Sequence, residues 1–312
     1  MSLRPKEIAR DICAAFIGRV LLRCCPAFVN AFYDSLPHRW LNFLVGHGFF
    51  GRPECAFRWH ITLANGKRLE LTVDPAESFS TGYAFDYKRH DVGLRRVQEF
   101  LIDRMGASSV YLDIGANVGV SSIYALSCGR TCWLFEPNTA LRPFVEKLLA
   151  ANRYTTARLE NAALSDAAGE ADFFVSRSSF LSSFARAHAE FEGEAIRIRV
   201  PMRTLDSYLP ELTATAREVV MKIDVEGHEM PVLRGAVETL KHYRPPVMIE
   251  LMDVATARTD AFAFMESHGY GCHGIVNAPK MTLKPLPSSS EVIAFRDINF
   301  LFVPKERALT IR

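Results

Sequence analysis

Short apolar runs alternate with segments of helical periodicity from about residue 110 to residue 268. The runs show little polar alternation, as expected of strands that are buried on both faces of a parallel sheet. They cover residues 110–114, 132–135, 158–162, 219–223 and 247–251. Helices are expected near residues 118–127, 139–152, 229–242 and 258–268. The alternation predicts an α/β fold in which crossover helices cover both faces of a mostly parallel sheet.

Two further groups of strands extend this pattern. Residues 171–175 and 196–200 read as an antiparallel pair inserted before the fourth parallel strand. Residues 270–276 and 298–303 supply two more strands near the end of the chain. We therefore expect a seven-stranded, mostly parallel sheet, while residues 285–290 have the composition of a brief flexible loop.

The first fifty residues have a different character. They are rich in Phe, Leu and Ala at helical spacing, with breaks at Pro26 and Pro37 and a glycine-containing stretch at residues 46–51. This composition predicts a helical extension, residues 1–54, ahead of the main domain.

A β-hairpin is expected at the start of the main domain, which we place at residues 55–312. Residues 56–63 and 68–73 alternate between apolar and polar side chains, and Asn65-Gly66 lies between the two runs. Asn-Gly favours the tight turn of a hairpin. A helix is expected next, at residues 92–105.

The N-terminal extension also raises the question of a membrane contact. Arg4, Lys6 and Arg10 stand before an apolar run at residues 12–22, in the order found in signal peptides and anchors. Arg19 interrupts this run, which is shorter than the roughly 18 apolar residues that a spanning helix needs. We expect an amphipathic helix that covers part of the main domain rather than a membrane contact.

Composition permits a large core and excludes some classes of partner. Of the 312 residues, 49% are hydrophobic and 23% are charged, which suits a globular chain. The 37 basic and 35 acidic residues leave a formal net charge of +2, so no overall field attracts nucleic acid, and none is expected as a partner. The seven cysteines lack paired short spacings, which favours reduced thiols and a cytoplasmic protein.

A glycine-containing loop follows the first parallel strand and opens a helix. Residues 113–119 read DIGANVG, and such small residues let backbone N–H groups approach the polar atoms of a ligand. A dinucleotide fingerprint would need glycines where Asn117 and Val120 stand. The order of Asp113, Gly115 and Gly119 instead resembles the first motif of class I methyltransferases. This favours S-adenosyl-L-methionine over NAD, with Asp113 orienting the methionine end of the cofactor.

Polar side chains also follow the next two strands. Glu136 comes directly after the second strand, about twenty residues beyond the loop, where a carboxylate can accept hydrogen bonds from both ribose hydroxyls. Asn161 and Ala162 follow the third strand, where a short amide beside a small apolar surface could read the adenine edge. Taken alone, an acidic residue at a strand end is more often a solvated cap, and Asn161 could be an ordinary strand-terminal residue. Combined with the loop, they predict a nucleoside site.

Further motifs carry a resemblance to a known family. They are FEP at residues 135–137, ALSD at 163–166, TLD at 204–206, KIDVEGHE at 222–229 and LRGA at 233–236. With DIGANVG, their order and spacing closely resemble FkbM-type methyltransferases over roughly residues 75 to 305. The family often has a Tyr-Glu pair upstream of the first motif, where this chain reads AFDY at residues 84–87.

The resemblance implies a class I, Rossmann-like fold and S-adenosylmethionine-dependent O-methylation. The implied acceptor is a hydroxyl of a sugar, a glycolipid or another natural product, hence a small molecule or a glycan. The pattern sets no oligomeric state.

The motif after the fourth strand supplies the candidate catalytic residues. Ligands of open parallel sheets lie beyond the carboxyl ends of the strands, so Asp224 and Glu226 are expected at the mouth of the cleft. A hydroxyl must lose its proton to become a good nucleophile, and a positioned base contributes about 10²–10⁴-fold in rate. Asp224, Glu226 or His228 could be this base, although Asp224 could equally bind the methionine amino group. Glu250, at the end of the fifth strand, could bind substrate hydroxyls.

Three alternatives stay open at this level. Asp224, Glu250 and Asp253 could together hold a divalent ion, because oxygen ligands suit magnesium, but the sequence does not lead us to expect a metal. The serine-rich residues 178–183 could form part of a lid over the substrate. The rival functions are a non-catalytic binding module that uses this fold as a scaffold, and an NAD-dependent oxidoreductase, against which the loop motif argues.

Overall fold

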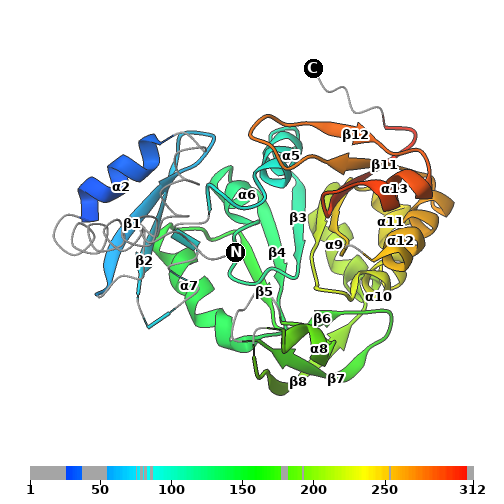
Figure 1. Ribbon diagram of the computed structural model, residues 1–312, viewed down its shortest axis with the longest axis horizontal. Helices are drawn as coiled ribbons and strands as arrows, with labels where there is room; N and C mark the ends of the chain where they lie inside the picture. The colour runs from blue at the N-terminus through cyan, green and yellow to red at the C-terminus, as the bar shows by residue number, and fades with distance from the viewer. Residues whose placement is uncertain are drawn as a thin grey trace, which may run out of the picture. The chain divides into compact units, whose positions relative to one another are not determined.

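The computed structural model describes residues 26–36, 55–74, 76–77, 80, 83–84, 87–176, 182–191, 193–252 and 254–307 (Figure 1). The chain divides into two compact units. The first comprises Met1–Val92 and Glu146–Arg153, and the second comprises Gly93–Val145 and Tyr154–Arg312. The expected helix at residues 12–22, Asp253 and most of the serine-rich stretch lie outside the described residues.

The second unit is built on one large sheet. Its described strands form an eight-stranded sheet in the order β12-β11-β13-β10-β9-β3-β4-β5. The strands β10, β9, β3, β4 and β5 run parallel to one another, whereas β13, β11 and β12 join antiparallel. The bounds are β3 (Ser109–Ile114), β4 (Thr131–Phe135), β5 (Ala157–Glu160), β9 (Glu218–Ile223), β10 (Val247–Glu250), β11 (Tyr270–Ile275), β12 (Leu283–Pro285) and β13 (Asn299–Pro304).

Helices cover both faces of this sheet. In Figure 1, α5 and α6 lie on one side of it, and α9, α10, α11 and α12 lie on the other. The bounds are α5 (Val92–Ile102), α6 (Ile123–Ser127), α7 (Arg142–Ala151), α9 (Leu209–Thr215), α10 (Glu229–Arg234), α11 (Val237–Tyr243), α12 (Ala255–Ser267) and α13 (Ser289–Ala294). The predicted α/β fold, with five parallel strands and two more strands near the end, is confirmed, and the structure shows that these last two strands join antiparallel.

The structure differs from the prediction in three elements. An eighth strand, β12, pairs with β11 at the sheet edge, where only a loop was expected. The helix predicted at residues 118–127 begins only at Ile123. The helix predicted at residues 229–242 is divided into α10 and α11 near Gly235, where an added Cβ would lie 2.0 Å from the backbone oxygen of Ser165. This close approach, which periodicity does not record, coincides with the break in the helix.

The order of the strands fixes where a ligand can bind. The chain passes from β3 outward to β4 and β5, and it returns to β9 on the other side of β3. All six residues of β3 are buried, and five of the six in β9 are buried, so this centre of the sheet is rigidly packed. Open parallel sheets bind ligands beyond the carboxyl ends of the strands at such a reversal.

The expected inserted pair is present and belongs to a small second sheet. Its strands β7 (Gly169–Val175) and β8 (Ile196–Arg203) pair antiparallel, and β6 (Ala163–Leu164) joins β8 in parallel, which gives the order β6-β8-β7 among the described residues. Between β7 and β8 lies the short helix α8 (Arg186–Ala189). This insertion brings residues 182–191 to the site described below.

The first unit contains the predicted hairpin and one helix. Strands β1 (Phe57–Thr62) and β2 (Arg68–Val73) pair antiparallel in the register Phe57↔Val73. Gly66 adopts a φ of +77° in the turn, which confirms the Asn-Gly turn signal. The helix α2 (Pro26–Ser35) starts at the proline that we expected to break the helical extension. Proline suits the first turn of a helix, where its missing N–H has no partner to lose.

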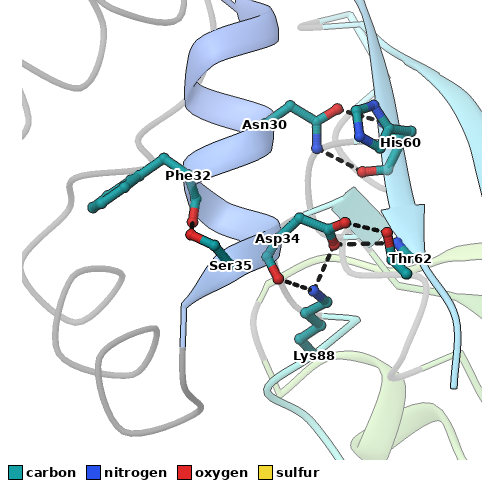
Figure 2. Close-up of polar contacts among 7 residues, drawn as sticks. All are labelled: Asn30, Phe32, Asp34, Ser35, His60, Thr62 and Lys88. Carbon is teal, nitrogen blue, oxygen red and sulfur yellow. Dashed lines mark hydrogen bonds and ion pairs between the residues drawn. The ribbon is translucent and has the colours of Figure 1, made fainter. Parts of the chain in front are cut away.

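Side chains of α2 occupy the free edge of β1 (Figure 2). Asn30 donates to the carbonyl of His60 at 2.6 Å and accepts from the N–H of the same residue at 2.7 Å. One helical turn further, Asp34 accepts from the N–H of Thr62 at 3.1 Å and is paired with Lys88. Four residues of helix rise about 6 Å, close to the span of two strand residues, so the two side chains match the strand edge. They replace the hydrogen bonds of a further strand.

Two expectations from the sequence concern membrane contact and the state of the cysteines. Among the described residues, no helix is long and apolar enough to cross a membrane. The four cysteines in this part of the chain, Cys55, Cys128, Cys132 and Cys272, are free thiols.

The contact between α2 and β1 can be tested with Asn30→Ala. Asn30 is almost fully buried and satisfies both backbone groups of His60, and losing such hydrogen bonds costs about 1–3 kcal/mol. The His60 amide should therefore exchange with solvent about tenfold faster or more, as measured by hydrogen exchange. Ser35→Ala is the matched control, because the exposed Ser35 hydroxyl bonds only within α2, to Phe32. Equal exchange in both variants would contradict the proposed edge contact.

Candidate active site

A buried lysine holds two carboxylates together at the carboxyl ends of the central strands. Asp113 on β3 and Lys222 on β9 are paired in the sheet register, so their side chains emerge side by side. The Lys222 Nζ lies 3.7 Å from Asp113 Oδ1 and 2.9 Å from Asp224 Oδ2. The side chains of Lys222 and Asp113 are 5% and 0% exposed, so these charges depend on each other rather than on water.

The three charges adjust one another's protonation. Burial alone would lower the pKa of Lys222, but the negative charges of Asp224 and Asp113 raise that pKa above its ordinary value. Burial raises the pKa of Asp113, even though Lys222 and the Ser122 hydroxyl, at 2.7 Å, favour its charged form. Lys222 therefore stays protonated. The sequence analysis missed this residue, although a lysine within the otherwise apolar run of β9 was a signal for a buried ion pair.

The glycine loop fits against this group without room for side chains. Gly115 has a φ of +78°, and an added Cβ would lie 1.7 Å from the backbone oxygen of Asp224. The N–H groups of Gly115 and Ala116 both donate to the Phe135 carbonyl at 3.0 Å, which fixes the loop to the end of β4. Gly119 also has a positive φ, +79°. The loop thus needs the glycines that the sequence analysis singled out.

Asn117 is held in the left-handed region with its amide turned inward. Its φ is +50°, which asparagine tolerates better than most residues. Its Oδ1 is buried and has no hydrogen-bond partner among the described residues. A buried acceptor without a partner is destabilising, and this one lies in the wall of a pocket. It marks a place where a ligand could donate a hydrogen bond.

Glu136 faces the same loop from the end of β4. Its Oε2 accepts from the N–H of Asn117 at 2.8 Å, and its Oε1 accepts from the N–H of Asn138 at 2.9 Å. Burial raises the pKa of this half-buried carboxyl to about 7, against the two backbone hydrogen bonds, which lower it. Each oxygen keeps a second lone pair for a ligand.

A small pocket, open to solvent, lies beside Glu136. Apolar side chains of Leu134, Val145 and Leu159 form part of its wall, and Asn161 lies at its edge as expected. Its full lining is Ala116, Asn117, Leu134, Glu136, Arg142, Val145, Leu159, Glu160 and Asn161.

The two residues predicted to contact the adenine, Asn161 and Ala162, differ in their surroundings. The Asn161 amide is partly engaged, because Arg142 donates to its Oδ1 at 2.6 Å and its Nδ2 donates to the Glu136 carbonyl at 3.2 Å. Ala162 is buried and is not part of the pocket lining. Arg142, on α7, is a pocket residue that sequence reasoning missed, because nothing local places a helical arginine opposite a strand end.

Three carboxylates converge beyond β9 and β10. Asp224, Glu226 and Glu250 each bring an oxygen within 4.8 Å of the others. Glu226 has a φ of +52°, an unfavourable conformation for a residue with a long side chain, and such strain is common at functional sites. Burial, together with the charges of Asp224 and Glu229, raises the pKa of Glu226 to about 8. Of the acids expected at the mouth of the cleft, these three are brought together.

The same cluster bears on the metal alternative. Lys222 already places a positive charge 2.9 Å from Asp224, so part of the negative charge is neutralised within the protein. Asp253, the third ligand considered from sequence, lies outside the described residues. An acidic cluster with its own lysine gives no support for a metal centre.

His228 does not belong to the carboxylate cluster. Its Nε2 lies 3.0 Å from the Ser165 hydroxyl, and its ring stacks at 4.3 Å on Phe184 of the insertion. Burial lowers the pKa of His228 below its ordinary value. The structure therefore places this residue in contact with the insertion, apart from the acids with which it was grouped in the sequence.

A second histidine reaches the cluster instead. The Nε2 of His188, on α8, lies 3.0 Å from Glu226 Oε2. Ser183, from the end of the serine-rich stretch, donates to the Glu226 carbonyl at 2.7 Å. The sequence analysis did not single out His188, because it lies 38 residues before Glu226 in a segment with no recognised motif.

Comparison with known proteins identifies a family for this chain. Residues 113–272, just over half of the chain, match the family model of the methyltransferase FkbM domain. Among curated proteins, none matches the chain.

Three solved structures illustrate the likeness. The chain is similar to methyltransferase FkbM from Methylobacillus flagellatus KT, with 16% identity, a TM-score of 0.42, and coverage of 64% of this chain and 44% of that chain. It therefore spans less than half the length of that protein. It is 14% identical to precorrin-6y C5,15-methyltransferase from Geobacter metallireducens GS-15, with a TM-score of 0.40 and coverage of 68% of this chain and 87% of that chain. It is 8% identical to a SAM-dependent O-methyltransferase from Thermotoga maritima, with a TM-score of 0.37 and coverage of 80% of this chain and 78% of that chain.

The close approach at the glycine loop can be tested by two matched alanine variants. Gly129→Ala introduces a side chain at a φ of +74° where no described atom lies within 4 Å, so it should cost only about 1–2 kcal/mol of backbone strain. Gly115→Ala adds a collision with Asp224 to the same strain, so it should destabilise the protein much more or prevent folding. Urea unfolding of both variants measures the difference. Equal losses would show that Gly115 is needed only for its φ.

Proposed function

The chain belongs to the FkbM methyltransferase family, and we propose that it transfers the methyl group of S-adenosylmethionine to a hydroxyl of a sugar, a glycolipid or a related natural product. Membership of this family and the fold make it a SAM-dependent methyltransferase. The type of acceptor and the role of each residue below are our proposal.

The observation that carries the proposal is the convergence of Asp224, Glu226 and Glu250 at the carboxyl ends of β9 and β10. Carboxylates accept hydrogen bonds, and neighbouring hydroxyls of a polyol can donate to several of them at once. The same negative charge stabilises a cationic methyl donor. A polyhydroxylated acceptor therefore suits this group better than an apolar or an anionic one.

The residues around the glycine loop fit S-adenosylmethionine. The loop approaches the strand end at Gly115 more closely than any side chain would allow, and the buried Asn117 Oδ1 is an acceptor in need of a donor. Glu136 has lone pairs left for two ribose hydroxyls, and the adjoining pocket offers apolar side chains to a purine. Asp113 and Asp224, which share Lys222, would hold the methionine end.

The cofactor supplies a methyl group on a positively charged sulfur. The protein has to align the acceptor oxygen with this methyl group and to remove the hydroxyl proton. Among the three bases left open by the sequence, Asp224 pairs with the permanent charge of Lys222, and His228 contacts Ser165. The partner of Glu226, by contrast, is His188, a group that can itself take up and release a proton. Glu226 has a pKa of about 8, close to the range in which a general base works best at neutral pH. We assign the removal of the proton to Glu226, and acceptor binding to Glu250.

Cofactor binding through Glu136 predicts a pH dependence. Ribose hydroxyls stabilise the carboxylate form, whereas the free carboxyl has a pKa of about 7. The affinity for S-adenosylhomocysteine should therefore rise about tenfold between about pH 6 and pH 8, as the carboxyl loses its proton before binding.

Isothermal titration calorimetry of the wild type and of Glu136→Gln checks this pH dependence. The variant should bind about 10- to 100-fold more weakly at pH 8, the loss expected for hydrogen bonds to a charged group, and its affinity should be nearly independent of pH. A variant that keeps the wild-type affinity and pH dependence would exclude Glu136 as the ribose ligand.

The reaction itself is tested with methyl-labelled S-adenosylmethionine and a panel of methyl glycosides. We expect the label to appear in the sugar as an ether, which survives mild alkali, whereas a methyl ester would be hydrolysed. Glu250→Gln should raise the KM for the glycoside while the affinity for S-adenosylhomocysteine stays the same. Tight binding of the cofactor without transfer to any hydroxyl would remove the acceptor half of the proposal and favour the non-catalytic binding module.

A further inference from the structure

We propose that His188 is the proton-relay partner of Glu226: it keeps this carboxylate ionised and passes the acceptor's proton on to solvent. This inference rests on the proposed function, since it concerns the hydroxyl proton that must leave during methyl transfer. It adds a residue from the insertion to a site that otherwise consists of the strand ends.

The geometry places the imidazole directly on the carboxylate. His188 Nε2 and Glu226 Oε2 are 3.0 Å apart, and the two side chains are 20% and 23% exposed. A proton must lie between these atoms, since two lone pairs would repel each other at this distance. When His188 is protonated, this partly buried imidazolium and carboxylate stabilise each other's charges more than an exposed pair would.

The insertion also contacts the loop that carries Glu226 and His228 through two other residues. The Ser183 hydroxyl donates to the Glu226 carbonyl at 2.7 Å, and Phe184 stacks on His228 at 4.3 Å. Ser183 is also bridged to Phe174 of β7 through two backbone hydrogen bonds, of 2.9 and 3.0 Å. These contacts hold α8 in place, so the approach of His188 to Glu226 is supported by its surroundings.

Glu226 needs such a partner because its surroundings oppose its charge. Burial, Asp224 and Glu229 all favour the protonated acid, and only Lys222 opposes them, so the pKa of Glu226 stands near 8. Glu250 of β10 adds a third carboxylate within reach. The other two charged residues of the α8 region, Arg186 and Glu190, pair with each other at 2.9 Å and so do not compete with His188 for Glu226. An imidazolium at 3.0 Å adds a second positive charge beside Glu226 and favours its ionised form.

The proton balance of the step is complete without any other reactant. The acceptor O–H bond breaks as the oxygen takes the methyl group, and the proton passes to the free oxygen of Glu226. The sulfur–carbon bond electrons stay on sulfur, which loses its positive charge. The imidazolium of His188 then releases a proton to solvent, and the shared proton remains between the two side chains. His188 acts through Glu226 and is a positioning residue in this scheme.

The first test needs no acceptor. Protein labelled with ¹⁵N-histidine is titrated by NMR in complex with S-adenosylhomocysteine, for the wild type and for Glu226→Gln. If the pair shares a proton, the ¹⁵N resonance of the His188 nitrogen that faces Glu226 should move in the variant, because the carboxylate that accepts its hydrogen bond is gone. An unchanged His188 ¹⁵N spectrum would overturn the proposal, whatever the acceptor is.

The second test uses methyl transfer to the methyl glycosides. His188→Gln keeps a hydrogen-bond donor but no charge, so the rate at neutral pH should fall about 10- to 100-fold, within the range for acid–base groups. The pH of half-maximal kcat should move about one unit towards alkaline pH, because Glu226 then ionises later. Imidazole in solution should partly rescue His188→Ala.

The control and the outcomes separate this inference from the proposed function. Arg186→Gln, on the exposed side of the same helix, should leave rate and pH profile unchanged. A slower His188→Gln enzyme with an unshifted profile would mean that His188 only packs the insertion, and this would refute the relay. If no glycoside is methylated, the acceptor assignment fails, while the NMR titration still decides whether His188 and Glu226 share a proton.

Discussion

The site depends on one ammonium group that is buried between two carboxylates. Lys222 lies between Asp113 on the neighbouring strand and Asp224 just beyond its own strand, and its side chain is 5% exposed. Removing one partner of such a pair leaves an uncompensated buried charge, at a cost of about 3–5 kcal/mol. Strands β3 and β9 are thereby tied together at the carboxyl ends, where the chain reverses direction across the sheet. These ion pairs position the glycine loop and the turn that carries Asp224 and Glu226.

From this centre, the site extends to both sides through backbone contacts. Towards β4, the loop amides bind the end of the strand, and Glu136 in turn binds two backbone N–H groups beside the pocket that we propose for the nucleoside. Towards β10, the strained turn at Glu226 aims a carboxylate at Asp224 and Glu250. One edge of the sheet thus carries a pocket lined by both polar and apolar residues, and also a cluster of carboxylates. This combination suits a cationic methyl donor and a hydroxylated acceptor.

The insertion gives the site a property that the strand ends lack. Beyond β9 and β10, burial and the charges of Asp224 and Glu229 raise the pKa of Glu226. The insertion brings the imidazole of His188, on α8, to 3.0 Å from this carboxylate. Because the insertion is a separate small sheet, it can vary among related chains while the central strands stay the same.

Sequence alone was sufficient where local rules decide the outcome. The five parallel strands follow from short apolar runs, the hairpin from Asn65-Gly66, and the loop from small residues between a strand and a helix. The position of Glu136 beside the glycine loop was predictable because the carboxyl ends of adjacent parallel strands meet at one edge of the sheet. Each of these depends on spacing along the chain and on steric rules for a few neighbouring residues.

Tertiary structure decided whatever depends on segments far apart in the chain. Ser165, just after β6, closes on Gly235 where the predicted helix is divided, and Arg142 donates to the Asn161 amide oxygen. His228, next to the acids in sequence, turns to Phe184, while His188 reaches Glu226 from 38 residues away. Periodicity and motifs record neither long-range packing nor the direction in which a side chain points. The sequence therefore determined which strand ends carry the site, and only the fold decided which side chains meet there.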